Sequence, residues 1–375
     1  MGDIMVNKIN EMMEKFGIGG EFKGYKVFNS GHINTTCMVT MEEDGVERQY
    51  VLQKINTNVF KRPVEVMDNI ANVTSFIRDK YEEVGYDASR RVLNFKHTPN
   101  GNYYATDNNG DYWRVYDFID NSITFDEASS EVLYETGKAF GDFQTMLSDY
   151  PSDELYDTIP NFHNTPKRYE TFKNVVETNS VGRVDGVQDE IAAYLQLEDI
   201  ASTMQRMLDN GQLPLRVTHN DTKCNNVLFD EETHKNLCVI DLDTVMPGLV
   251  GFDFGDAMRF ASNTRVEDST DLENVKVDLD KFDAFTQGFI ESVGDSLTKA
   301  EIDTLVLGAI TMTTECGLRF LTDYIDGDNY FKTSYPEHNL DRARCQLALA
   351  QNMIANMDKM QQIVNNWAKV REFND

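Results

Sequence analysis

Residues 217–228 read VTHNDTKCNNVL, and residues 239–243 read VIDLD. Asp221 lies in a polar loop, Asn226 follows at the start of an apolar run, and Asp241 ends a second apolar run. The two apolar runs are joined by a polar turn and therefore predict a short β-hairpin. A hairpin of this length brings the three polar side chains to one end of the strand pair.

These side chains are typical of chemistry that moves a phosphoryl group from ATP. A carboxylate must orient the attacking hydroxyl group, and Mg²⁺ needs hard oxygen ligands. We therefore expect Asp221 to be the catalytic carboxylate and Asn226 and Asp241 to be the Mg²⁺ ligands. Lys223 is expected to neutralise charge on the transferring phosphate as a second catalytic residue. The alternative is an ordinary polar turn followed by a strand that ends in an aspartate.

The same residues resemble the catalytic and metal loops of the aminoglycoside phosphotransferase/choline kinase group. That group usually reads H-G-D-x-H-x-x-N, whereas this chain has Asn220 for the glycine and Lys223 for the second histidine. The H-N-D-T-K form is similar to that of N-acetylhexosamine 1-kinases. Further stretches that resemble this subfamily are SGHIN at 30–34, IPNFHNT at 159–165 and GFDFGD at 251–256. The resemblance covers most of the chain.

The resemblance implies a two-lobed, protein-kinase-like α+β fold, with a small antiparallel β-rich N-terminal lobe and a larger, mainly helical C-terminal lobe. The residue pattern agrees, because hairpin signals such as Asp44-Gly45 precede residue 119 and helical periodicity follows it. We expect residues 1–119 to bind the nucleotide and residues 120–375 to carry the catalytic and sugar-binding groups. Continuous helices are expected over 187–208, 299–321 and 339–367, and a solvated acidic surface over 267–283.

The 375 residues include 63 acidic and 35 basic side chains, a formal net charge of −28. Such a surface repels phosphate backbones and acidic membranes, so we expect neither nucleic acid nor a membrane as partner. Residues 1–119 hold 14 basic and 17 acidic side chains, and residues 120–375 hold 21 and 46, so the acid lies in the second part. Five scattered cysteines and the lack of a signal-peptide pattern predict a cytoplasmic protein. An oligomeric state does not follow from the sequence.

Nucleotide contacts are expected at two backbone segments. The turn at residues 30–35 has one glycine where phosphate-cradling loops often have three, and on its own it would be a plain hairpin turn. Its candidate phosphate-covering residues are Ser30, Gly31, His32, Ile33, Asn34 and Thr35. The resemblance implies that the strand exit at residues 116–119 connects the lobes and binds adenine through its backbone. Its residues are Tyr116, Asp117, Phe118 and Ile119.

Lys54 is the candidate nucleotide-binding lysine of residues 1–119. It alternates with Tyr50 and Leu52 and is expected to point to the inner side of the sheet, where a lysine needs an anion. The resemblance implies that it pairs with the nucleotide phosphates and with a carboxylate of the next helix. Glu65 and Asp68 are both available, and the spacing does not choose between them. The alternative is an exposed edge lysine.

The acceptor side offers a less specific pattern. Glu315, Arg319 and Asp323 share one helix face, a spacing that also suits simple i,i+4 ion pairs. The resemblance implies that Arg319 and Tyr330 lie near a sugar, with Glu315 beside them. His163 is a candidate partner for a sugar hydroxyl, and the alternative is a turn contact.

A helix that opens at Asp253 is expected to use this residue as a cap and to pair Asp256 with Arg259. These three residues are expected to be structural.

The resulting function is an ATP- and Mg²⁺-dependent kinase that phosphorylates the anomeric hydroxyl of an N-acetylhexosamine (N-acetylglucosamine or N-acetylgalactosamine). One alternative is a kinase of a cationic small molecule, such as an aminoglycoside or choline. The acidic second part favours a cation, whereas Arg319 would repel one. The other alternative is a catalytically silent binding protein with a kinase shape.

Overall fold

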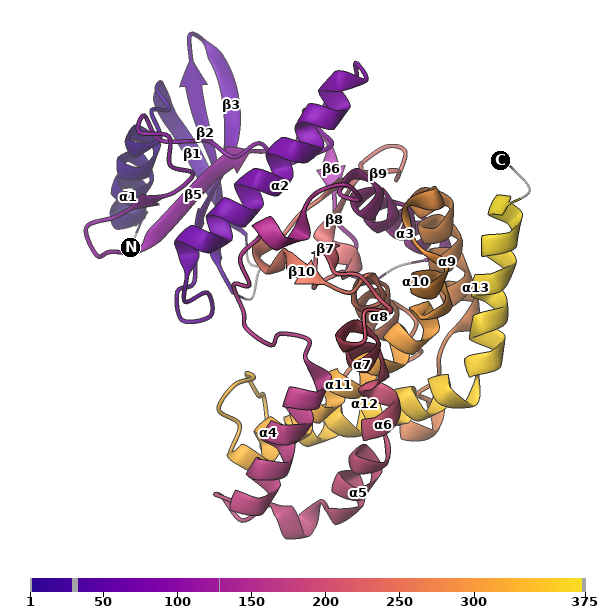
Figure 1. Cartoon of the computed structure of the whole chain (residues 1–375). Helices are drawn as coiled ribbons and strands as arrows, with labels where there is room; N and C mark the ends of the chain where they lie inside the picture. Colours follow the sequence, from indigo (N-terminus) through magenta and orange to yellow (C-terminus); the bar gives the residue numbers. More distant parts are fainter. Residues whose placement is uncertain (1, 29–32, 128, 373–375) are drawn as a thin grey trace.

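The computed structural model describes residues 2–28, 33–127 and 129–372. It has an antiparallel β-sheet region at the N-terminal end and a mainly helical region that follows (Figure 1). This is the α+β architecture expected from the sequence. None of the helices within the described ranges is long and apolar enough to cross a membrane.

The N-terminal region is built on a five-stranded sheet in the order β1-β2-β3-β5-β4. Its strands are β1 (Glu21–Phe28), β2 (Thr35–Glu43), β3 (Val46–Lys54), β4 (Ala105–Thr106) and β5 (Tyr112–Asp117). Neighbouring strands are antiparallel throughout. The β2–β3 turn has φ of 52° at Asp44 and 80° at Gly45, the positive values that the predicted hairpin needs.

The two faces of this sheet are covered by different helices (Figure 1). Helix α1 (Gly2–Lys15) covers one face, where its Ile9 packs in one cluster with Tyr50 and Leu52 of β3. Helix α2 (Pro63–Glu83) covers the other face, next to the helical region. Because side chains alternate along a strand, Tyr112, Arg114 and Tyr116 of β5 belong to the α2 face.

The helical region is organised around α3 (Ser130–Met146), α8 (Val250–Ala261), α9 (Leu279–Val293) and α11 (Leu305–Asp326). Helix α8 lies very close to α11. A Cβ atom added to Gly308 on α11 would be only 2.0 Å from the carbonyl oxygen of Gly251 on α8. Only glycine permits this approach. The close packing holds α8 beneath the polar loop that follows β7.

Short strands support that loop. They are β6 (Ser122–Ile123), β7 (Arg216–Thr218), β8 (Val227–Asp230), β9 (Asn236–Val239) and β10 (Met246–Gly248). β8 and β9 form the hairpin that the sequence predicts, and β7 pairs with β10. The loop after β7 and the segment after β9 therefore lie side by side.

Three of the expected helices are interrupted, and the one expected over 339–367 is divided at Asn356. The remaining helices of four or more residues are α4 (Thr165–Thr178), α5 (Gln188–Gln196), α6 (Glu198–Ala201), α7 (Thr203–Asp209), α10 (Lys299–Asp303), α12 (His338–Ala355) and α13 (Met357–Glu372). The helix expected over 187–208 is thus divided into α5, α6 and α7. The helix expected over 299–321 is divided at Thr304, whose hydroxyl donates to the carbonyl oxygens of Ala300 and Glu301.

The acidic segment 267–283 is not a simple solvated surface, which corrects the expectation. Val275, Val277 and Phe282 are buried in the largest core cluster. Asp278 is the N-cap of α9 and accepts hydrogen bonds from the next turn. Part of the acid therefore marks the start of a core helix.

Candidate active site

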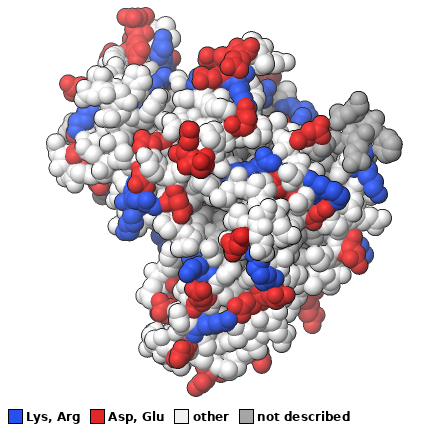
Figure 2. Space-filling model, viewed as in Figure 1, with Lys and Arg blue, Asp and Glu red and all other residues white. Residues whose placement is uncertain are grey.

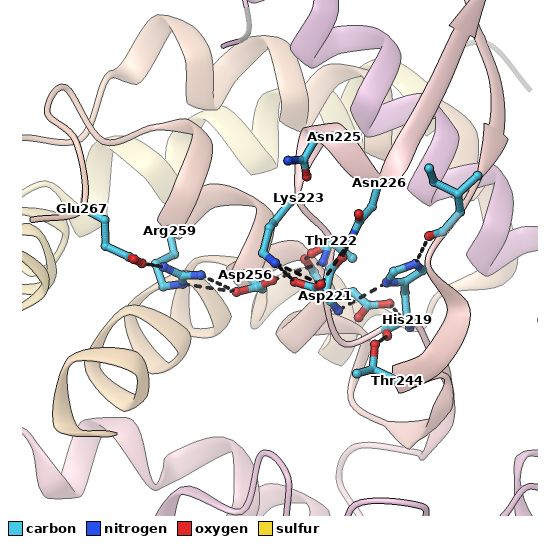
Figure 3. Close-up of polar contacts among 12 residues, drawn as sticks. His219, Asp221, Thr222, Lys223, Asn225, Asn226, Thr244, Asp256, Arg259 and Glu267 are labelled. Carbon is cyan, nitrogen blue, oxygen red and sulfur yellow. Dashed lines mark hydrogen bonds and ion pairs between the residues drawn. The ribbon is translucent and has the colours of Figure 1, made fainter. Parts of the chain in front are cut away.

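Asp221 and Asn226 are in direct contact. The Nδ2 atom of Asn226 donates to the backbone oxygen of Asp221 at 2.8 Å and to its Oδ2 at 3.1 Å (Figure 3). Lys223 Nζ is 2.7 Å from Oδ1 of the same carboxylate and 3.0 Å from Oδ2. Since the amide nitrogen of Asn226 donates to Asp221, its side-chain oxygen is the atom that could coordinate a metal ion.

Asp241 follows β9 and is solvent-exposed. Among the described residues no side chain or backbone group donates to its carboxylate. Protein on its other sides desolvates the group, and the nearby charges of Asp243 and Asp221 act in the same direction, so the pKa of Asp241 is raised above its usual range. A cation would relieve this unfavourable charge.

Asn226 and Asp241 would offer a metal ion one amide and one carboxylate oxygen. Within the described residues no cluster of three or more His, Cys, Asp or Glu side chains is arranged to hold a metal. A set with so few protein ligands suits Mg²⁺, which commonly keeps water and substrate phosphate oxygens in its coordination shell.

The loop that carries Asp221 is held by α8. Asp253 accepts hydrogen bonds from the backbone N–H groups of His219 at 2.8 Å and Asn220 at 2.7 Å. Asp256 accepts one from the N–H of Thr222 at 3.1 Å. These contacts fix the backbone on both sides of the catalytic candidate.

Part of the expectation for α8 is wrong. The helix begins at Val250, three residues before Asp253, so Asp253 holds the loop instead of capping the helix. The expected pair of Asp256 and Arg259 is present at 3.1 Å, and Arg259 also reaches Glu267 at 2.7 Å (Figure 3).

Asn220 explains one departure from the family pattern. Its φ of 63° lies in the left-handed region, which glycine and asparagine tolerate better than most residues. Its side chain also bonds the carbonyl oxygen of Thr244 at 2.9 Å. Asn220 thus adopts a conformation that glycine also adopts readily, and it adds a contact to the segment after β9.

His219 joins the same two segments (Figure 3). Its Nε2 is 2.8 Å from the carbonyl oxygen of Ile240, and its Nδ1 accepts from the N–H of Asp221 at 3.3 Å. These partners assign the proton to Nε2. The imidazole therefore sets the distance between the loop of Asp221 and the segment of Asp241.

The structure corrects the expected pairing of Lys54. This residue lies at the end of β3 on the face covered by α1, and its Nζ is 2.5 Å from Asp111 Oδ2. Glu65 pairs with Arg62 at 2.8 Å, and Asp68 is exposed. Neither helix carboxylate meets Lys54, because both lie on α2 across the sheet.

The phosphate turn is described only in part. Ser30, Gly31 and His32 lie outside the described residues. Ile33 and Thr35 are exposed. Asn34 donates from Nδ2 to Asp243 Oδ2 at 2.6 Å and accepts at Oδ1 from the N–H of Asn56 at 2.9 Å.

The strand exit at 116–119 already uses some of its backbone groups. The N–H of Asp117 bonds Asn94 and that of Phe118 bonds Gln49, each at 3.1 Å. No acceptor for the N–H of Ile119 is found in the described part of the chain. Tyr116 packs its ring against Phe95, with ring centres 5.0 Å apart.

The acceptor-side residues are brought together in the helical region. Glu315 accepts from Thr165 Oγ1 at 2.7 Å and contacts His163 Nδ1 at 2.9 Å. Burial opposes ionisation of Glu315, but these contacts outweigh it and lower its pKa. The Nε2 atom of His163 is buried without a partner in the described residues.

Arg319 does not form the i,i+4 ion pairs that its spacing allows. Its guanidinium lies 5.5–5.9 Å from the ring centres of Phe162, Tyr330 and Phe331, and within the described ranges no carboxylate pairs with it. Asp323, one turn further on, instead accepts from the backbone N–H groups of residues 329–331. This anchors the loop of Tyr330, whose side chain is 69% exposed.

Arg114, on β5 of the N-terminal sheet, was missed by the sequence analysis. Arg114 is fully enclosed and binds the carboxylate of Asp243. The only signal was a charged residue within the apolar strand YWRVY.

Comparison with known proteins gives one family and several related folds. Residues 24–276 match the model of the phosphotransferase enzyme family (APH). A microcompartment-associated aminopropanol kinase has a TM-score of 0.64 at 15% identity, over 94% of this chain and 98% of that one. A spectinomycin phosphotransferase solved with ADP and spectinomycin has a TM-score of 0.58 at 12% identity, over 94% and 98%.

A choline kinase from Cryptosporidium parvum has a TM-score of 0.56 at 15% identity, over 98% of this chain and 99% of that one. At such low identities these likenesses show the fold alone. They confirm the kinase-like α+β fold, and the family match covers well over half of the chain. This protein belongs to the phosphotransferase enzyme family.

Proposed function

We propose that this phosphotransferase transfers the γ-phosphoryl group of ATP to the anomeric hydroxyl of an N-acetylhexosamine. The observation that carries the proposal is the geometry around Asp221, whose carboxylate is oriented by Lys223 and Asn226. In this arrangement Asp221 orients the sugar hydroxyl and accepts its proton. Lys223 stays protonated beside Asp221, which raises its pKa against the effect of burial, and it offsets negative charge on the phosphoryl group.

Asn226 and Asp241 would hold Mg²⁺ in this proposal. When bound there, Mg²⁺ would supply positive charge that offsets the negative charge of the phosphoryl group. This role is supported by the raised pKa of Asp241 and by the lack of a donor to its carboxylate among the described residues.

ATP would bind across the sheet region, with the division between a nucleotide lobe and a catalytic lobe at residue 119. The N–H of Ile119, which has no acceptor among the described residues, supports an adenine contact at residues 116–119. The turn at 30–35 would cover the phosphates, and Asn34 already reaches towards the segment of Asp241. We do not assign Lys54, Glu65 or Asp68 to the nucleotide, because Lys54 is engaged with Asp111.

The acceptor would lie near His163, Glu315, Arg319 and Tyr330. An unpaired guanidinium provides fixed donors for carbonyl and hydroxyl oxygens, such as those of an N-acetyl sugar. The buried Nε2 of His163 is a further polar group without a partner among the described residues. The positive charge of Arg319, which pairs with no carboxylate in the described part of the chain, disfavours a cationic acceptor at this position.

The second candidate is a kinase of an amine-bearing small molecule. It is supported by the net charge of −25 on residues 120–375, where 46 acidic side chains face 21 basic ones. It is also supported by the names of the similar folds, an aminopropanol kinase and a choline kinase. On the face seen in Figure 2, however, acidic and basic side chains are interspersed, so the charge does not single out one acceptor site.

The experiment that separates these functions measures ATP consumption with a panel of acceptors. The panel contains N-acetylglucosamine, N-acetylgalactosamine, glucose, galactose, choline and kanamycin. Turnover with the N-acetyl sugars supports the proposal, and turnover with choline or kanamycin alone supports the second candidate. Mg²⁺–ATP binding without turnover of any acceptor would identify a silent binding protein.

A further inference from the structure

A buried ion pair connects the sheet region to the segment that follows β9. Arg114 on β5 binds Asp243 with both terminal guanidinium nitrogens, the NH2–Oδ2 distance being 2.9 Å. Each side chain is only 3% exposed. The remaining guanidinium nitrogen, Nε, donates to Gln53 Oε1 on β3 at 2.8 Å. Each of the three guanidinium nitrogens of this arginine therefore has a partner inside the protein.

The same carboxylate also binds the phosphate turn. Asn34 donates to Asp243 Oδ2 at 2.6 Å. Asp243 thus accepts hydrogen bonds from the charged Arg114 of the sheet and from the neutral Asn34 of the turn. It is the point where these two parts of the N-terminal region meet the segment of Asp241.

Asp241 needs such support because its backbone is in an unusual conformation. Its φ is 61°, a left-handed value that persists in an aspartate when neighbouring contacts hold it. On one side the segment is tied to the catalytic loop, since the N–H of Ile240 donates to Asn226 O at 2.9 Å and Thr244 Oγ1 donates to His219 O at 2.6 Å. On the other side the ties are Asp243 and a bond from Asn69 on α2 to Val245 O at 3.0 Å.

The charges point the same way. Asp241 and Asp243 are two residues apart, so this short segment carries two carboxylates. A guanidinium that grips both oxygens of Asp243 compensates that charge in place. Asp241 is then the carboxylate of the two that stays open to a cation.

We propose that Arg114 and Asp243 are positioning residues that fix Asp241 as the metal-binding carboxylate and link it to the sheet. The inference rests on the proposed role of Asp241. The ion pair joins β5 of the N-terminal sheet to the segment after β9, whereas the pair expected for Lys54 would have stayed within the N-terminal region. Arg114 is assigned a positioning role because its side chain is only 3% exposed and acts through Asp243.

The test measures how strongly Mg²⁺ raises the affinity for ADP, by calorimetric titration of ADP with and without Mg²⁺. Arg114→Lys keeps the charge but cannot grip both oxygens, and Asp243→Asn keeps the shape but removes the charge. We expect each variant to reduce the Mg²⁺-dependent gain in ADP affinity by about tenfold, on the scale of a disturbed outer-shell contact to a metal ligand. ADP affinity without Mg²⁺ should stay within about twofold, because no nucleotide contact is removed.

A matched control is available in the helical region. Arg216 binds Glu301 with two contacts, at 2.5 and 2.8 Å, and the side chains are 14% and 2% exposed. Arg216→Lys should lower the unfolding temperature in the same way as Arg114→Lys but leave the Mg²⁺-dependent gain unchanged. The double variant Arg114→Lys/Asp243→Glu, in which the longer carboxylate meets the shorter cation, should regain part of the loss.

Asp241→Asn separates the two levels of the proposal. If this variant keeps the full Mg²⁺-dependent gain, the metal role of Asp241 is wrong and the positioning role loses its basis. If Asp241→Asn loses the gain while Arg114→Lys and Asp243→Asn keep it, the proposed function stands and the positioning inference is overturned. If Arg114→Lys and Arg216→Lys lose the same share of the Mg²⁺-dependent gain in ADP affinity, the inference is also overturned. The Arg114–Asp243 pair would then only stabilise the fold.

Discussion

Replacing Asp221 with asparagine should abolish most turnover while leaving the site folded. The substitution keeps the shape of the side chain and removes its charge. The loop does not depend on that charge, because Asp253 holds the backbone N–H groups of His219 and Asn220. Asn226 also keeps its bond to the backbone oxygen of residue 221 at 2.8 Å.

The size of the effect follows from the lost chemistry. A positioned proton acceptor contributes ~10²–10⁴-fold to a rate. At about 1.36 kcal/mol per factor of ten, the barrier for Asp221→Asn should rise by ~3–5 kcal/mol. Lys223 loses its partner at 2.7 Å, but a cation cannot accept the proton in place of Asp221.

The assay compares kcat for ATP consumption with ADP affinity measured by calorimetry. Asp221→Asn should keep ADP affinity within about threefold, since the proposed adenine contact lies elsewhere. Asn225→Ala is the matched control, because Asn225 lies in the same loop and makes only a 3.4 Å contact to Asp126. A kcat within about tenfold of the unmodified enzyme would refute the assignment of Asp221 as proton acceptor.

Three further predictions concern other parts of the chain. Lys54→Ala should leave the KM for ATP unchanged and cost at most about 1 kcal/mol of stability, because the pair with Asp111 is partly exposed; a several-fold rise in KM would restore Lys54 to the nucleotide site. Arg319→Ala should raise the KM for an N-acetyl sugar by about tenfold or more, as expected for a lost charged hydrogen bond, and leave the KM for ATP unchanged; an unchanged sugar KM would remove Arg319 from the acceptor site. Gly308→Ala should cost ~1–3 kcal/mol in denaturant unfolding and lower kcat, because the added Cβ would be 2.0 Å from a backbone oxygen of α8. Gly186→Ala is its control, since nothing lies within 4 Å of the added atom, and equal stability of the two variants would contradict the packing argument.

The hairpin that carries the candidate catalytic residues was predictable because its constraints are local. Asp221 and Asn226 are five residues apart, and the β8–β9 hairpin between Asn226 and Asp241 is signalled by two apolar runs. The left-handed φ of Asn220 even explains why this chain can replace the family's glycine. Short sequence separations leave the backbone few ways to arrange these groups.

The errors arise where distant segments decide the outcome. Alternation along β3 correctly grouped Lys54 with Tyr50 and Leu52, but not which helix covers that face. Nothing in the local pattern shows that α1 lies there and α2 lies opposite. Arg114 was missed for a similar reason, because its partner Asp243 is 129 residues away in the chain.

The acceptor side shows how competition among partners limits such predictions. The face shared by Glu315, Arg319 and Asp323 was correctly identified, yet both carboxylates prefer other partners. Glu315 binds Thr165 and His163, and Asp323 binds the backbone of the loop that carries Tyr330. Arg319 is left with aromatic neighbours in a region of net charge −25. A cation without a carboxylate partner among the described residues of so acidic a region argues that the local site, and not the total charge, determines which acceptor is bound.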